Sequence, residues 1–170
     1  MLNFSLSELI YSETAVKYNI NNMPDIKSLD CMLNLIVYCL QPLRDKLQKP
    51  MIITSGFRNQ KVNDLVGGVL TSQHTKGQAV DFIVKDMTVN QLIEFIKKSG
   101  IEYDQLINEY DRWVHISFVK NHNRKQVLKY DIKYVFYDYI FSSPGLLAEY
   151  KDLNLREDGC MLRPIKYLYH

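Results

Sequence analysis

The sequence predicts an α+β domain, with a small and mostly antiparallel sheet and helices packed on one side of it. Apolar residues recur at helical spacing from Ser28 to Leu47 and again between Thr88 and Gly100. Four short apolar or β-branched runs have the length of strands, at 51–54, 79–84, 104–109 and 113–119. The order along the chain is helices, two strands, a helix, two strands and a tail, and strands covered on one side by helices define the α+β class.

Capping signals indicate where the first helices begin. Ser5 and Glu8 fit a Ser-x-x-Glu capping box, which predicts a short helix there. A second short helix is expected over 12–18, followed by a polar loop at 19–24. In the long apolar helix that comes next, Pro42 should kink the chain or split off the last turn.

Turn residues separate the remaining elements. A turn at 55–58 follows the first strand, and residues 62–66 are expected to form one helical turn. Thr88 and Gln91 form another capping box, which starts the helix that ends near Gly100. The last two strands should pair through a tight turn around 110–112.

Length and composition indicate one globular domain. The chain has 170 residues, of which 46% are hydrophobic, enough for a proper core. Its 21 basic and 19 acidic residues give a net charge of +2, which is too balanced for a dedicated nucleic-acid-binding protein. Three cysteines without a CxxC pair argue against a disulfide framework and against a cysteine-ligated zinc site.

The chain shows no targeting or membrane pattern. No stretch approaches the ~20 apolar residues of a membrane span, and the N-terminal residues lack the basic start and apolar run of a secretory signal. We therefore expect synthesis in the cytoplasm, and any action elsewhere requires release or another export route.

The stretch TSQHTKGQAVDF at 71–82 combines a histidine before a strand with an aspartate inside it. His74 offers a neutral nitrogen and Asp81 an anionic oxygen, which are two typical ligands of first-row metals. Between them, Gly77 and Ala79 are small enough to let the backbone turn sharply and to leave space above a site. This spacing predicts half of a metal centre.

His115 is the third candidate ligand. Side chains alternate along a strand, so His115 should lie on the face opposite to Val114 and Ile116, away from the core. Two histidines and one aspartate leave a fourth coordination position open, which is the arrangement of a catalytic zinc ion. The pKa of a water molecule bound there falls from ~15.7 toward ~7.

Such a centre needs a proton acceptor and a group that holds the substrate. Glu109 is the best candidate for the base, because it ends the strand that precedes His115, and Asp111 in the turn is the reserve. Arg58 follows a strand end, and its planar guanidinium can grip a carboxylate through two parallel hydrogen bonds. An arginine of this kind suits a peptidase that acts near a free carboxyl group.

Three pieces of the chain, SGFR, GGVLTSQHTKGQAVDF and INEYDRWVHISF, closely resemble the zinc D-alanyl-D-alanine carboxypeptidases and L-alanyl-D-glutamate endopeptidases, whose fold the hedgehog signalling domain shares. The pieces FSLSELIYSETA, NNMP and LQPLR are similar to the lead-in of the cell-wall members, including phage lysins, so the resemblance covers about residues 3–120. The family signature S-x-H-x-x-G-x-A-x-D falls on 72–81 and the later W-x-H on 113–115. The resemblance implies a hedgehog-like, D,D-peptidase-like fold and zinc bound by His74, Asp81 and His115.

One position departs from the commoner pattern. Many members carry the catalytic acid three residues before the last histidine, where this chain has Arg112. A subset of cell-wall members, and hedgehog domains, place a glutamate six residues before, and Glu109 matches that spacing. The resemblance also places the carboxylate-binding arginine on Arg58. The residues expected to line the cleft or to support the ligands are Ser72, Gln73, Trp113 and Ser117.

We therefore predict a zinc peptidase core in residues 1–120 and a C-terminal extension of unknown role in 121–170, packed on the core. The expected activity is hydrolysis of peptide bonds in peptidoglycan stem peptides, as a carboxypeptidase or an endopeptidase, by a monomer that uses Zn²⁺ at the cell wall after phage lysis or export. No nucleic acid partner is expected.

Two other functions fit the same residues. A hedgehog-like domain can keep its zinc and serve only as a binding module for wall material or a partner protein. A structural phage or tail-associated protein could dock through the extension. Taken singly, each site residue also fits an ordinary role, such as a loop histidine or a surface arginine, and only their joint occurrence favours the metal centre.

Overall fold

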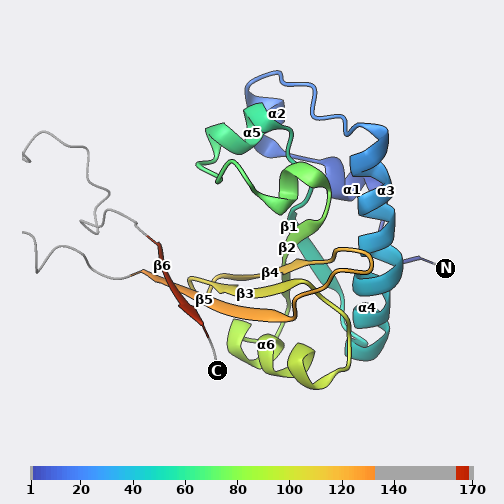
Figure 1. The fold of residues 1–170 in the computed structure, drawn as a ribbon, viewed down its shortest axis with the longest axis vertical. Coiled ribbons are helices and arrows are strands. Elements are labelled where there is room, and N and C mark those ends of the chain that lie inside the picture. The colour runs from blue at the N-terminus through green and yellow to red at the C-terminus, as the bar shows by residue number, and fades with distance from the viewer. Residues whose placement is uncertain (1, 133–163, 169–170) are drawn as a thin grey trace, which may run out of the picture.

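The computed structural model describes residues 2–132 and 164–168 and confirms the α+β class. Its strands are β1 (Met51–Ser55), β2 (Ala79–Val84), β3 (Gln105–Glu109), β4 (Trp113–Ser117), β5 (Gln126–Ile132) and β6 (Pro164–Leu168). They form one sheet in the order β1-β2-β4-β3-β5-β6 (Figure 1). Neighbouring strands run antiparallel except β3 and β5, which are parallel.

Short polar side chains begin the N-terminal helices, and the sequence predicts this for Ser5. The hydroxyl groups of Ser5 and Ser12 cap α1 (Leu6–Ile10) and α2 (Glu13–Lys17) by accepting hydrogen bonds from backbone N–H groups of the first turn. The next helix, α3 (Ile26–Leu35), begins earlier than expected because Asp25 supplies the cap.

Two further helices follow the same rule. Asn59 caps α5 (Gln60–Leu65), so this helix starts before the predicted turn at 62–66. Thr88 and Gln91 form both hydrogen bonds of the predicted capping box at the start of α6 (Val89–Lys98).

The long helix changes its winding just before Pro42. Residues Ile36–Leu40 form a π-helical turn, η1, and Gln41–Leu47 continue as α4. Proline has no amide hydrogen, so the regular bond to the carbonyl four residues earlier cannot form, and its ring crowds that carbonyl. The widened turn relieves the conflict. The split predicted at Pro42 is therefore this π-helical turn, which separates α3 from α4.

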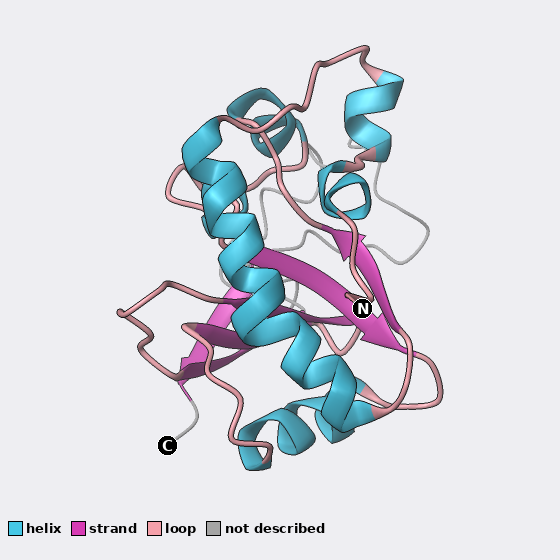
Figure 2. Ribbon diagram, turned by 90° about the vertical axis from the view of Figure 1, so that its right-hand side faces the viewer, coloured by secondary structure: helices cyan, strands magenta, loops and turns pink. Residues whose placement is uncertain are grey.

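The sheet presents its apolar face to the helices and its other face to the site. Figure 2 shows the α3–α4 helix crossing in front of the strands. The shared core contains residues from helices and strands alike, among them Leu9, Met32, Leu35, Leu43, Leu92, Ile96, Val80, Phe82, Leu106, Val114 and Ile116. Asp81 and His115 alternate with these strand residues and face the opposite way, as predicted for His115.

The sheet continues past the expected boundary at residue 120. Strand β5 pairs with β3, and β6 pairs with β5, so part of the extension belongs to the same sheet as the site. The rest of the extension, 133–163 and 169–170, lies outside the described residues. Among the residues that are described, no helix is long and apolar enough to cross a membrane.

Candidate metal centre

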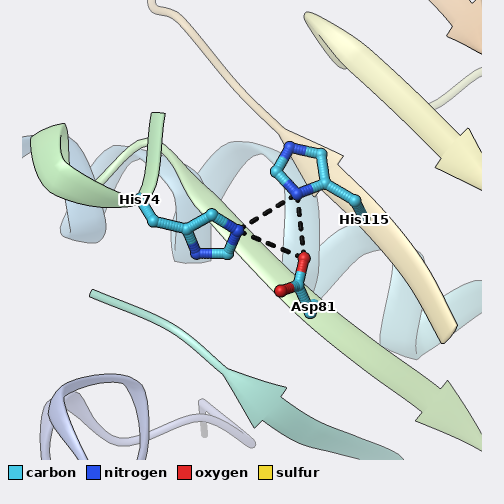
Figure 3. A group of neighbouring side chains, drawn as sticks. All are labelled: His74, Asp81 and His115. Atoms are coloured by element: carbon cyan, nitrogen blue, oxygen red, sulfur yellow. Dashed lines mark hydrogen bonds and ion pairs between the residues drawn. The ribbon is translucent and has the colours of Figure 1, made fainter. Parts of the chain in front are cut away.

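His74, Asp81 and His115 meet at one point although three different elements carry them. Asp81 and His115 are direct cross-strand partners on β2 and β4. His74 reaches them from a 3-10 turn, η2 (Gln73–Lys76), where the sequence predicted a plain loop. Figure 3 shows both imidazole rings pointing at the carboxylate. All three side chains are buried, with relative exposures of 2%, 6% and 6%.

The distances between the ligating atoms suit a small ion. Asp81 Oδ1 lies 2.8 Å from His115 Nδ1 and 3.2 Å from His74 Nε2, and the two nitrogens are 3.1 Å apart. Ligands at about 2.0–2.1 Å from a tetrahedral zinc ion are separated by roughly 3.3 Å. The three side chains therefore fit zinc with only small adjustments.

A hydrogen bond behind His74 determines which nitrogen faces the centre. His74 Nδ1 lies 2.7 Å from the carbonyl oxygen of Gly56, and because a carbonyl can only accept, Nδ1 carries the proton. Neutral His74 therefore points the lone pair of Nε2 at Asp81 Oδ1, which is also an acceptor. A proton on His115 Nδ1 or a bound metal ion would satisfy both acceptors.

The electrostatic surroundings keep the ligands in their metal-binding forms. Burial lowers the pKa of His74, only partly offset by the charge of Asp81, so the imidazole stays neutral. Burial alone would raise the pKa of Asp81, but the interactions with His74 and His115 together hold it well below its usual range. A neutral histidine and an ionised aspartate are the forms that bind metals.

Glycines let the chain approach closely around His74. Gly77 ends η2 with a φ of +69°, and a Cβ there would lie 2.3 Å from the carbonyl oxygen of Ser28. Gly56, whose carbonyl orients His74, leaves no room for a side chain either, since a Cβ would lie 2.1 Å from the carbonyl oxygen of Leu9. Both positions require glycine for the ligand geometry to form.

Glu109 stands on the same face of the sheet as the three ligands. It pairs with Trp113 across β3 and β4, and the Trp113 indole Nε1–H donates to Glu109 Oε2 at 2.9 Å. Burial raises the pKa of Glu109, the charge of Asp81 raises it further, and the charges of His115 and Arg58 partly offset this. The carboxylate is therefore oriented, half-buried and more basic than usual.

Asp111, the reserve candidate for the base, is engaged elsewhere. Its carboxylate accepts a hydrogen bond from the side chain of Asn108 at 2.7 Å and pairs with Lys129 at 3.4 Å. Asn108 pairs with Val114, whose side chain is in the core, so this contact lies on the face away from the ligands. The geometry favours Glu109.

Arg58 is held next to the centre with hydrogen-bonding capacity to spare. Its pKa is lowered by burial, while the charges of Asp81 and Glu109 act in the opposite direction, which places the guanidinium within electrostatic range of both. Its Nε is buried and has no hydrogen-bond partner among the described residues. A buried donor of this kind is suited to an acceptor on a bound molecule.

The other residues expected at the cleft have structural partners. The Ser72 hydroxyl accepts from the backbone N–H of His74, and the Ser117 hydroxyl accepts from that of Gln105. The Gln73 amide donates to Asp104 at 2.8 Å. These bonds support the turn that carries His74 and the edge of the sheet, and contact of these side chains with substrate stays a prediction.

Sequence reasoning missed two buried side chains that brace the site. Asn22 in the NNMP loop donates to the carbonyl of Phe57 and accepts from the backbone N–H of Asn59, so it clamps the chain on either side of Arg58. Asp104, which is 1% exposed, joins Gln73 to the guanidinium of Arg124. The only sequence signal for Asn22 is that it lies in the NNMP piece, which is similar to the cell-wall members of the family. No sequence signal pointed to Asp104.

The buried group of two histidines and one aspartate could hold a metal ion, and a half-buried carboxylate and a half-buried arginine lie near it. The comparison with protein families agrees. The chain belongs to the peptidase M15 family, whose model matches residues 2–117. Its members are zinc-dependent metallopeptidases, and the buried group could hold that ion. None of the curated proteins compared matches the chain.

Proposed function

We propose that the protein hydrolyses peptide bonds in peptidoglycan stem peptides with zinc bound by His74, Asp81 and His115. The observation that carries the proposal is the convergence of three lone-pair donors, all buried and within 3.2 Å of one another, with Glu109 beside them. The family membership supports a peptidase, and the resemblance of the quoted motifs to cell-wall enzymes supports the peptidoglycan substrate.

Each protein group has a separate task in this reaction. Zinc, when bound, supplies a Lewis acid that polarises the scissile carbonyl and eases deprotonation of water. Glu109 accepts the proton of the attacking water and returns it to the leaving amine. Its raised pKa suits both transfers, since a base that is too weak cannot take the proton and one that is too strong cannot release it.

Arg58 positions the substrate. Its buried Nε, which has no hydrogen-bond partner among the described residues, suits a substrate carboxylate, such as the C-terminus of a stem peptide or the side chain of a D-glutamate. Binding such a group offsets the cost of keeping the guanidinium partly buried.

Digestion of purified peptidoglycan tests the proposal. Mass spectrometry of the soluble products, run with zinc and with a chelator, should show zinc-dependent release, either of a terminal amino acid by a carboxypeptidase or of larger fragments by an endopeptidase. Zinc-loaded protein that binds wall material without cleaving it would identify a binding module instead. The proposed site of action is the cell wall, reached after phage lysis or by export.

A further inference from the structure

The register of three strands places Glu109 between two aromatic residues. On β4 its cross-strand partner is Trp113, and on the parallel strand β5 its partner is Tyr130. Cross-strand partners project from the same face of a sheet, and this is the face that carries His115. Trp113, Glu109 and Tyr130 therefore form one row across the sheet, next to the row that contains Asp81 and His115.

A fourth residue, Tyr110, ties the two ends of this row together. Its ring centroid is 6.3 Å from that of Trp113 and 6.4 Å from that of Tyr130. Its backbone N–H also donates to the carbonyl oxygen of Tyr130 at 2.8 Å. With a φ of +60° it leaves the strand alternation, which lets its side chain join the face that Glu109 occupies.

Glu109 is constrained from both sides in this row. Trp113 holds one carboxylate oxygen by a hydrogen bond, and Tyr130 occupies the other flank, where both it and Tyr110 interact electrostatically with the carboxylate. All three aromatic side chains are half-buried, so they also limit the access of water to Glu109. Tyr130 lies beyond residues 2–117, to which the family model is matched.

We propose that Tyr130 is a positioning residue for Glu109, so that β5 forms part of the catalytic site. The inference rests on the proposed function for the role of Glu109. Tyr130 acts through packing: its ring fills the flank opposite Trp113 and keeps the carboxylate in the orientation that the indole bond selects. A side chain at this position that lacks a ring leaves Glu109 free to rotate toward solvent.

The only tryptophan of the chain is Trp113, so its fluorescence reports on this row without reference to catalysis. Three variants form the test: Tyr130→Ala removes the ring, Tyr130→Phe removes only the hydroxyl group, and Tyr11→Ala is the matched control. Tyr11 is 62% exposed and caps the end of α1, away from the row. Acrylamide quenching, zinc content, kcat and KM are measured for each.

We expect Tyr130→Ala to increase quenching of Trp113 and to lower kcat by about 10- to 100-fold, the loss typical of a misplaced catalytic group. Zinc content and KM should change little, because the three ligating residues and Arg58 are not part of the row. Tyr130→Phe and Tyr11→Ala should behave like the wild type. A Tyr130→Ala variant with unchanged quenching and kcat overturns the inference, and so does a Tyr130→Phe variant that loses as much activity as Tyr130→Ala.

Two further outcomes are informative. If Tyr130→Ala does not fold, Tyr130→Leu replaces it, and wild-type quenching and kcat in that variant overturn the inference. If the wild type shows no zinc-dependent hydrolysis, the proposed function fails, whereas quenching that rises only in the ringless variants still supports the packing of Tyr130 in the row.

Discussion

Replacing Glu109 by glutamine separates catalysis from metal binding. Glutamine has nearly the same shape, and its carbonyl oxygen can still accept the hydrogen bond from Trp113 Nε1, which in the wild type is 2.9 Å long. The side chain should therefore stay in place while losing its ability to take a proton. Zinc should remain bound, because the three ligating atoms belong to other residues.

The expected loss follows from the task of the base. General acid–base catalysis contributes about 10²–10⁴-fold, so kcat of Glu109→Gln should fall by that factor, or about 2.7–5.4 kcal/mol in the activation barrier. The assay is product release from peptidoglycan by mass spectrometry, together with metal analysis of the same sample. Asp111→Asn is the control, since that exposed carboxylate bonds to Asn108 and Lys129. An active Glu109→Gln beside an inactive Asp111→Asn would show that the reasoning chose the wrong acid.

The same substitution should raise the stability of the metal-free protein at neutral pH. Burial and the charge of Asp81 raise the pKa of Glu109 above its ordinary value of 4.5. The folded state therefore binds this proton more tightly than the unfolded state does. The stabilising contribution of the neutral carboxyl is present below pH 4.5 and is lost as the pH rises through the folded pKa. The melting temperatures of Glu109→Gln and wild type should therefore match under acid and diverge at neutral pH, with the variant higher. A variant that melts below the wild type at neutral pH would contradict this.

Three other predictions concern the metal centre. His115→Ala should lose bound zinc as well as activity. The control variant His122→Ala, at an exposed position, should keep both. Unchanged zinc stoichiometry in His115→Ala would remove His115 from the ligand set. Because burial lowers the pKa of His74 below its ordinary 6.5, NMR of its imidazole ring in the metal-free protein should give a titration midpoint below that pH, and a midpoint at or above 6.5 would contradict a buried neutral side chain. Gly56→Ala should destabilise the fold by about 1–3 kcal/mol through a clash with the Leu9 backbone. It should also weaken zinc binding, because the Gly56 carbonyl orients His74. A variant with the melting temperature and zinc affinity of the wild type would refute the close approach of Gly56 to Leu9.

Local sequence signals were sufficient for most of the fold. Caps such as Ser5 and Thr88 identified helix starts because the capping side chain and its partner are only three residues apart. Asp25 and Asn59 were overlooked as caps, and the helices that follow them start earlier than predicted for that reason. Pairing between distant segments has no local signal, and so the parallel pairing of β5 with β3 was not predicted.

The candidate ligands were predictable because strand alternation and small-residue spacing constrain them directly. Strand alternation predicted that His115 faces the side of the sheet opposite to Val114. The pairing register of β2 and β4 then places His115 beside Asp81. The backbone partner of His74 was beyond sequence reasoning, since a carbonyl group carries no residue-specific signal, and the Gly56 carbonyl became visible only in the fold.

The choice between Glu109 and Asp111 depended on geometry that spacing alone does not contain. The two residues are close in sequence, yet Tyr110 and Asp111 both have positive φ, with values of +60° and +53°, so the chain reverses between them. Glu109, the last residue of β3, keeps the alternation that faces the ligands, whereas Asp111 turns back to Asn108 on the other face. Because two residues so near in sequence lie on opposite faces, the point at which β3 ends decides which of the two carboxylates faces the candidate ligands.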